Sequence, residues 1–229
     1  MTYLQKNQQY WEKGYHAVNV DRPAFLLQGR ILRPQFGLPL NDRTTKLLDF
    51  GCGQGAVLNY FHMQGYDAVG VDISETDLAI GKARYPHIGS KFLKCEPSPK
   101  DNEFYGFKND IDVVTAIQAL YYFTDEHLQT CLEKIYLAMK PGGVFFASMM
   151  GEQSKEFFEN SQPGEDGLRA VNFKNTRLNV ENYFISFVKD EEHLKKKFSM
   201  FKPAHIGYYT TKIRQDEGDG FHYTFCGVK

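Results

Sequence analysis

The stretch of sequence that decides the fold is Asp49-Phe50-Gly51-Cys52-Gly53-Gln54-Gly55. Residues 46–50, with the apolar Leu47, Leu48 and Phe50, predict a buried strand, and residues 56–63 after the glycines predict a helix. At the start of a helix, unpaired backbone N–H groups and the helix dipole attract a negatively charged group. Glycines let the chain turn tightly and let a ligand approach where a Cβ would otherwise stand. The sequence therefore predicts a ligand-binding loop at the carboxyl edge of a parallel sheet.

Strand-like and helix-like segments alternate around this loop. Further strands are expected over 67–72, 91–95, 111–117 and 144–149, with a turn at 140–143, and helices over 74–84, with Ser74 as the cap, and from 124 or 125 to 139. Such alternation is typical of a parallel sheet with crossover helices, so we expect a doubly wound α/β fold. A helix over 190–201 and two strands over 204–213 and 221–228 complete the prediction, and the strands form an antiparallel hairpin.

One domain of 229 residues is expected, because this length suits a single large core. Its parts are an N-terminal helical lid over 1–40, a cofactor-binding core over 46–150, a substrate-side insertion over 151–185, and a C-terminal helix with the hairpin over 186–229. Residues 151–181 are polar and poorly periodic, which predicts a long loop with a functional role.

Composition narrows the class of protein. The net charge of −1 makes nucleic acid an unfavoured partner, because gripping phosphates needs a large excess of lysine and arginine. The cysteines show neither disulfide-framework nor zinc-site spacing, which suits a reducing compartment; they are Cys52, Cys95, Cys131 and Cys226. No signal-peptide core and no apolar run of about 18 residues is present, so a soluble, cytoplasmic protein without a membrane partner or a bound metal is expected. A homodimer stays open.

Two kinds of cofactor use a glycine loop after a buried strand. Dinucleotide enzymes show G-x-G-x-x-G, whose pyrophosphate lies at the helix end. Here the spacing is G-x-G-x-G, and Asp49 stands two positions before the first glycine, where it would repel a pyrophosphate. A ligand with an ammonium group beside its carboxylate would be supported instead. Asp72 ends the next strand, where its carboxylate can accept hydrogen bonds from both hydroxyls of a ribose.

In these features the sequence resembles the class I S-adenosylmethionine-dependent methyltransferases. Four segments carry the resemblance in the right order, namely Leu47–Gly55, Val69–Ser74, Asp112–Ile117 and Leu137–Phe146. The resemblance implies a mostly parallel, seven-stranded, Rossmann-like sheet with a reversed C-terminal hairpin. It also implies an enzyme that moves a methyl group from S-adenosylmethionine to an O or N atom of a small polar metabolite, leaving S-adenosylhomocysteine.

The resemblance also implies roles for single residues. Gly51, Cys52 and Gly53 would contact the methionine part through the loop, with Asp49 supporting it. Asp72 would hold the ribose and Ile73 would pack on the adenine. Glu96 would lie near the adenine amino group, although Cys95-Glu96-Pro97 departs from the usual pattern, and Ile117 would cover the adenine or the methionine chain.

The acceptor would lie beside Gln118–Phe123. Many small-molecule members have Leu-x-His there, and Tyr122 stands in place of the histidine, with Tyr121 beside it. A phenol titrates near pH ~10 and is a poor base at neutral pH, so orienting the acceptor is the expected catalytic role, with simple packing as the alternative. The aromatic residues of 10–16 could form a lid. His222 is expected to be structural, and Arg30 to lie at the surface.

Two other functions stay open. One is a regulatory module that binds S-adenosylmethionine without transferring its methyl group. The other is an RNA methyltransferase, which the charge and the absence of an Asn/Asp-Pro-Pro-Tyr/Phe motif disfavour. Substrate-binding candidates in and next to the 151–181 segment are Arg169, Asn172, Arg177 and Tyr183.

Overall fold

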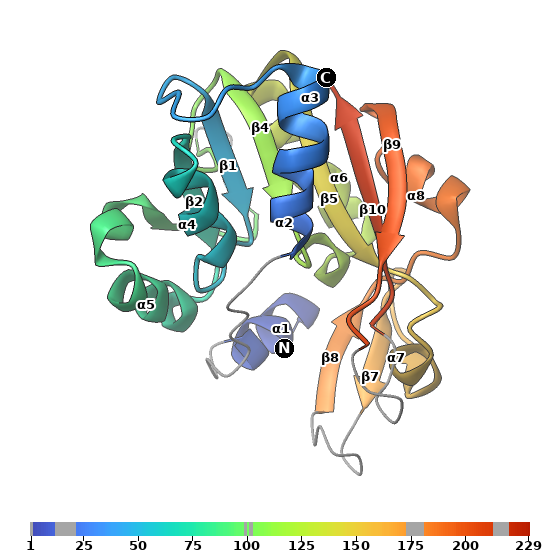
Figure 1. Cartoon of the computed structure of the whole chain (residues 1–229). Helices are drawn as coiled ribbons and strands as arrows, with labels where there is room; N and C mark the ends of the chain where they lie inside the picture. The colour runs from blue at the N-terminus through green and yellow to red at the C-terminus, as the bar shows by residue number, and fades with distance from the viewer. Residues whose placement is uncertain (1, 12–21, 99, 101–102, 173–180, 213–219) are drawn as a thin grey trace.

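The computed structural model describes residues 2–11, 22–98, 100, 103–172, 181–212 and 220–229. Its centre is a seven-stranded sheet of order β3-β2-β1-β4-β5-β10-β9 (Figure 1). The strands are β1 (Lys46–Phe50), β2 (Asp67–Asp72), β3 (Phe92–Lys94), β4 (Ile111–Ala116), β5 (Met139–Met150), β9 (Lys202–Tyr209) and β10 (His222–Val228). β1 to β5 pair in parallel, and β10 runs antiparallel to both of its neighbours. The predicted doubly wound sheet with a reversed C-terminal hairpin is confirmed.

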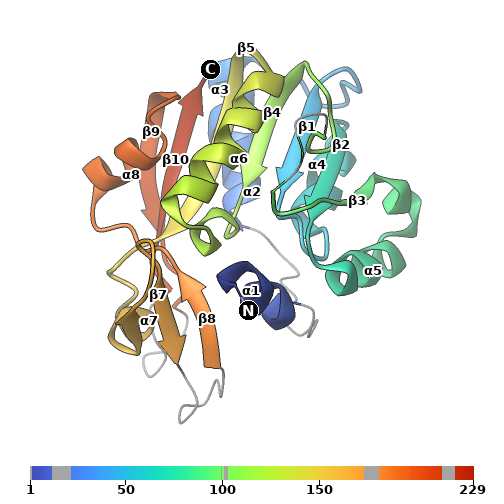
Figure 2. The ribbon, with the colours of Figure 1, turned by 180° about the vertical axis from the view of Figure 1, so that it is seen from behind.

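Helices cover both faces of this sheet. One face carries α2 (Arg22–Leu27), the π-helical turn η1 (Gln28–Leu32), α3 (Arg33–Phe36) and α4 (Ala56–Met63) (Figure 1). The other face carries α6 (Asp125–Ala138) and α8 (Glu191–Lys197) (Figure 2). Below the sheet lie α1 (Tyr3–Trp11), at the carboxyl ends of the strands, and α5 (Glu75–Arg84), which leads through the short helix η2 (Pro86–Lys91) to β3.

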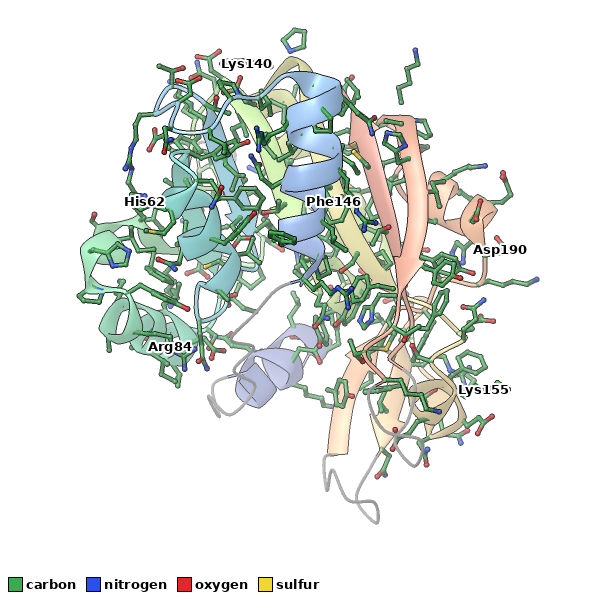
Figure 3. All side chains as sticks on the ribbon, viewed as in Figure 1. His62, Arg84, Lys140, Phe146, Lys155 and Asp190 are labelled. Atoms are coloured by element: carbon green, nitrogen blue, oxygen red, sulfur yellow. The ribbon has the colours of Figure 1, made fainter. Side chains whose placement is uncertain are left out.

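The central strands are apolar on both faces, as buried parallel strands must be. Consecutive residues of β1 and β5 point to opposite sides, so Leu47 and Phe146 pack on the α2 and α4 side while Leu48 and Phe145 pack on the α6 and α8 side. Phe146 is labelled in Figure 3, where it lies beneath the segment α2–α3. The two resulting cores hold the sheet rigid and fix where its strands end.

Local sequence signals set most of the boundaries. The Ser74 hydroxyl accepts a hydrogen bond from the Asp77 backbone N–H at 3.1 Å and starts α5, and Thr124 caps α6 through the His127 backbone N–H at 3.2 Å. The predicted turn at 140–143 lies inside β5, where the pairing with β4 shifts register and Gly142 takes a φ of +80°. α8 is predicted over 190–201; in the structure Asp190 is its cap, and the helix runs from Glu191 to Lys197.

For the segment 151–181, after β5, the sequence predicts a long loop. This prediction is wrong for the residues of the segment that the structure describes. Instead, the chain forms α7 (Lys155–Glu159) and an antiparallel three-stranded sheet of β6 (Ser161–Pro163), β7 (Arg169–Asn172) and β8 (Glu181–Ile185). These strands are short, and β7 buries Val171 alone, so no long periodic pattern marks them in the sequence. Figure 1 shows this small sheet beside α1, below the large sheet.

The hairpin and the lid complete the chain. β9 starts at Lys202, two residues before its predicted start, and ends at Tyr209. Residues 216–220, which connect the two predicted strands of the hairpin, fall mostly outside the described residues. Residues 12–16 of the expected aromatic lid also fall outside them. Among the helices that the structure describes, none combines the length and the apolar character needed to cross a bilayer.

Candidate active site

A cavity of about 510 Å³ opens at the carboxyl ends of the parallel strands. It brings together all ten residues that the sequence singled out as cofactor-binding or catalytic: Asp49, Gly51, Cys52, Gly53, Asp72, Ile73, Glu96, Ile117, Tyr121 and Tyr122. Strand crossovers at β1 and β4 create the crevice, because successive connections leave the sheet on opposite sides there. The volume is in the range of small-ligand sites.

The glycine loop turns sharply over the end of β2. The N–H groups of Gly51 and Cys52 both donate to the carbonyl oxygen of Val71, at 2.9 and 3.0 Å. Gly51 has a φ of +72°, and a Cβ on it would lie 2.4 Å from the Cβ of Ala119. Gly53 has a φ of +49°, and a Cβ on it would meet no protein atom within 4 Å. The first glycine is therefore required by the protein's own packing, while the second keeps open a space in the cavity.

Asp72 fixes the loop from below. Its Oδ2 accepts the Gly53 N–H at 2.8 Å, and its Oδ1 accepts the Ser74 N–H at 2.8 Å. Burial raises the pKa of Asp72 to about 6, and the two backbone hydrogen bonds oppose that rise. Because each carboxylate oxygen has two lone pairs, both can still accept a ligand hydroxyl. The carboxylate thus suits a ligand with two neighbouring hydroxyls.

The other residues of this end support the loop or supply apolar walls. Asp49 is buried, and its Oδ1 accepts a hydrogen bond from the Thr115 hydroxyl at 2.9 Å. Burial raises the pKa of the Cys52 thiol well above its usual range, so this cysteine is an inert part of the wall. Ile73 and Ile117 offer aliphatic side chains to the cavity, and Glu96 lies on the loop after β3.

The opposite end of the cavity is built from side chains. Tyr121 is buried and Tyr122 half-buried in the 3-10 turn η3 (Leu120–Tyr122), with their ring centroids 4.5 Å apart. The His222 ring lies 5.7 Å from that of Tyr121 and stacks on that of Tyr209 at 5.1 Å. The lining also includes Met150, Phe157, Tyr183, Thr211 and Gly220. This end can accommodate a small polar or aromatic molecule.

Helix α1 closes the cavity from outside, with Leu4 and Asn7 in the lining. The Asn7 amide donates to the carbonyl oxygens of Tyr122 and Phe184, at 3.2 and 3.3 Å, and its Oδ1 accepts the Phe184 N–H at 3.0 Å. A second attachment joins the Tyr3 hydroxyl to His127 Nδ1 at 2.7 Å. The helix is thus held against both η3 and β8.

The structure adds some residues to the site and leaves others out. His222, expected to be structural, lines the cavity, as do Gln118 and Asn7. No local motif marks these three, because only the fold brings their elements together. Two arginine candidates are absent from the lining: Arg30 is exposed in η1, and Arg169 donates to Ser161 and lies over the ring of Phe158. Asn172 is exposed, and Arg177 lies outside the described residues.

No three His, Cys, Asp or Glu side chains of the described residues gather in a way that could hold a metal ion. The fit to S-adenosylmethionine rests on the open space at Gly53, the acceptor capacity of Asp72 and the aliphatic side chains between them.

Comparisons with known proteins agree with this geometry. Residues 48–145 match the family model described as a methyltransferase domain. A ubiquinone biosynthesis O-methyltransferase of Acinetobacter baumannii (strain ACICU) is 26% identical over 112 residues, 49% of this chain and 46% of that protein. The enzyme of the same name from Aliivibrio fischeri (strain MJ11) is 28% identical over 128 residues, 55% of this chain and 53% of that protein. The chain spans about half the length of these curated relatives.

Solved structures share the fold over nearly the whole chain. A SAM-dependent methyltransferase from Methanosarcina mazei has a TM-score of 0.67 at 15% identity, covering 85% of this chain and 95% of that one. The 1,6-didemethyltoxoflavin-N1-methyltransferase of Burkholderia thailandensis, solved with S-adenosylhomocysteine, has a TM-score of 0.67 at 18% identity, covering 99% and 88%. The glycine loop, the strand order and the methyltransferase-domain model that matches residues 48–145 together support a class I S-adenosylmethionine-dependent methyltransferase, a family whose cofactor is S-adenosylmethionine.

Proposed function

We propose that this protein transfers a methyl group from S-adenosylmethionine to an oxygen or nitrogen atom of a small polar metabolite. The observation that carries the proposal is the single cavity that joins the glycine loop and Asp72 at one end to Gln118, Tyr121 and Tyr122 at the other. A methyl donor held at the first end would present its reactive group toward the second.

The cofactor end would act mainly through the backbone. Gly53 leaves room for the methionine part, Gly51 lets the loop pass close to Ala119, and Asp49 supports the loop through Thr115. Asp72 would hold the ribose hydroxyls by charge-assisted hydrogen bonds, which are the stronger kind. Ile73, Ile117 and Glu96 would bound the adenine. When bound, the cofactor supplies an electrophilic methyl group on a sulfonium sulfur.

The acceptor end would position the nucleophile and exclude water. Tyr122 or Tyr121 would orient the acceptor through a phenolic hydroxyl, since positioning supplies much of the rate in a displacement of this kind. Helix α1, fixed by Asn7 and Tyr3, covers the cavity and keeps bulk water from the reacting atoms. The ring of Tyr183 adds a wall from the small sheet.

The volume of the cavity, about 510 Å³, favours a small acceptor over a macromolecule. The names of two similar proteins, a ubiquinone biosynthesis O-methyltransferase and a 1,6-didemethyltoxoflavin-N1-methyltransferase, also refer to small molecules. The net charge of −1 is unfavourable for RNA, which binds through many phosphate contacts.

The experiment has two stages. Calorimetry first measures binding of S-adenosylhomocysteine and of NAD; then S-adenosylhomocysteine release is assayed with catechol, tyramine and other small phenols, alcohols and amines. Binding followed by release with one acceptor supports the proposal. Cofactor binding without release from any acceptor would favour the regulatory module, and release with RNA alone would favour the RNA methyltransferase.

A further inference from the structure

Gln118 has a backbone conformation that side-chain-bearing residues rarely adopt, with a φ of 56°. It comes two residues after β4 ends and lines the acceptor end of the cavity. A residue is kept in the left-handed region only where its surroundings fix it there, and such residues are frequent at ligand sites. The conformation of Gln118 therefore calls for a reason beyond the turn itself.

Three hydrogen bonds fix both the backbone and the amide of this residue. The backbone N–H of Gln118 donates to Ser148 Oγ at 2.8 Å, and its Nε2 donates to the Tyr209 hydroxyl at 3.1 Å. The Tyr209 hydroxyl in turn lies 3.4 Å from Ser148 Oγ. Ser148 belongs to β5 and Tyr209 to β9, so the two strands hold the glutamine from two sides. One of the two N–H groups of the amide is thus committed to Tyr209.

The amide oxygen of Gln118, Oε1, takes no part in these hydrogen bonds. Within the part of the chain that the structure describes, Oε1 of Gln118 has no hydrogen-bond partner, and the residue is half-buried in the cavity wall. An amide oxygen accepts hydrogen bonds and cannot donate them. A ligand group that meets Oε1 must therefore carry a hydrogen on oxygen or nitrogen.

We propose that Oε1 of Gln118 binds the O–H or N–H hydrogen of the methyl acceptor and so selects acceptors that carry such a hydrogen on or beside the atom to be methylated. This inference rests on the proposed function and narrows its substrate class. Phenols, alcohols and amines satisfy the amide oxygen. Ionised carboxylates and thioethers have no hydrogen to offer, and a carboxylate would also face the oxygen with like polarity, so both are disfavoured.

The rival account is that Gln118 only ties the end of β4 to β9. The two accounts differ in what happens when the side chain is removed. Gln118→Gly relieves the left-handed backbone, because glycine adopts this conformation freely, and deletes the amide. If the side chain serves the acceptor, the melting temperature stays the same or rises. If the side chain serves the fold, the melting temperature falls by several degrees.

The second part of the experiment measures turnover. Gln118→Leu keeps a side chain of similar bulk, one atom shorter, and removes its polarity. We expect S-adenosylhomocysteine affinity to stay within about twofold of wild type while turnover with catechol and with tyramine falls about tenfold or more. Tyr209→Phe, which keeps the ring stacked on His222 and frees the amide to rotate, should raise the KM for the acceptor by a smaller factor.

The outcomes are decisive in each case. A stable Gln118→Gly protein together with loss of turnover in both Gln118 variants supports the inference. Turnover within about twofold of wild type in Gln118→Leu overturns it. If wild-type protein binds S-adenosylhomocysteine but methylates neither probe, the proposed function loses its support. The melting temperature of Gln118→Gly still tests the inference about Gln118 in that case, and a value below that of wild type overturns the inference.

Discussion

The two ends of the cavity are built in different ways. At the cofactor end, most of the groups come from three short stretches, 49–57, 72–77 and 95–97, and much of the contact surface is backbone. At the acceptor end, the lining comes from α1, η3, β5, α7, β8 and the tips of β9 and β10, and side chains make the surface. The first end should therefore respond to changes in the main chain, and the second to the deletion of single side-chain atoms.

The largest expected effect is at Gly53. A methyl group added by Gly53→Ala would meet no atom of the described residues within 4 Å, so among these residues it would oppose only a ligand in the cavity. We expect S-adenosylhomocysteine to bind about a hundredfold more weakly, equivalent to roughly 2.7 kcal/mol, as measured by calorimetry. The unfavourable left-handed conformation should lower stability by about 1–2 kcal/mol.

Gly142→Ala is the matched control for that change. Gly142 also has a positive φ and no neighbour for a Cβ, but it lies at the other end of the sheet, in the turn before the buried part of β5. It should show a similar stability loss and unchanged cofactor affinity. Gly51→Ala should lose more stability than either, because its Cβ would overlap Ala119. If Gly53→Ala and Gly142→Ala bind S-adenosylhomocysteine with equal affinity, the claim that the backbone of the glycine loop forms the cofactor end of the cavity is refuted.

The next effect concerns Tyr122 at the acceptor end. Tyr122→Phe keeps the ring and deletes the hydroxyl, so turnover should fall about ten- to a hundredfold, or roughly 1.4–2.7 kcal/mol in the barrier, with cofactor affinity preserved. Tyr121→Phe is the control, because Tyr121 is the more buried neighbour. If turnover falls in the Tyr121 variant instead, the orienting hydroxyl is on Tyr121. If both variants keep full turnover, the orienting role passes to other groups of the lining.

The same contrast explains what the sequence could predict. The segment 46–74 and the pattern of β4 and β5 are local: a strand, a turn that needs glycine, a helix cap and an acid at a strand end follow one another along the chain. Their bounds agree with the structure within a residue or two for β1, β2, α4 and α5. These local signals, together with the resemblance to the methyltransferase family, singled out the candidate cofactor residues.

Asp72 should make cofactor binding depend on pH. With its pKa raised to about 6 by burial, the carboxylate is mostly ionised at pH 7 and mostly protonated at pH 5. A protonated carboxyl loses the charge-assisted hydrogen bonds to the ligand, so the dissociation constant of S-adenosylhomocysteine should rise about tenfold from pH 7 to pH 5. Calorimetry at a series of pH values measures it. Asp72→Asn should bind weakly and without this pH dependence.

The stability of the protein without ligand should change in the opposite sense. A folded-state pKa above the unfolded value of 3.8 means that Asp72 favours folding when protonated, and this contribution is lost as the pH rises through about 6. Asp72→Asn removes this unfavourable buried charge but also one of the two hydrogen bonds that the carboxylate accepts from the Gly53 and Ser74 N–H groups, so the two effects oppose each other and the stability of the unliganded protein at pH 7 should change little. A marked loss of stability at pH 7 would show that the charge of Asp72 supports the fold.

The smallest effect is expected at Asn7, which attaches α1 to both η3 and β8. Asn7→Ala removes three hydrogen bonds from a buried side chain, so stability should fall by about 1–3 kcal/mol, and S-adenosylhomocysteine should dissociate severalfold faster because α1 covers the cavity. Stopped-flow fluorescence measures the dissociation rate. Gln5→Ala on the exposed side of the same helix removes only the hydrogen bond that Gln5 Oε1 accepts from the Thr2 N–H at 2.9 Å, so it is the control and should leave the dissociation rate unchanged.

The parts that the sequence could not predict share a physical cause. Gln118, His222 and Asn7 enter the site through contacts with residues far away in the sequence, as in the bonds from Gln118 to Tyr209, 91 positions apart, and from Asn7 to Tyr122, 115 positions apart. The small sheet of β6, β7 and β8 has strands of three to five residues, too short for a period of two to be visible. Both depend on tertiary packing that no local pattern encodes.

The central claim is that the loop Asp49–Gly55 with Asp72 forms a site for S-adenosylmethionine, and calorimetric titration at pH 7.5 tests it most directly. Wild-type protein should bind S-adenosylhomocysteine at one site per chain and should not bind NAD, and Gly53→Ala should weaken the binding about a hundredfold while Gly142→Ala leaves it unchanged. Binding of NAD in place of S-adenosylhomocysteine, or equal affinities for the two glycine variants, would contradict the account.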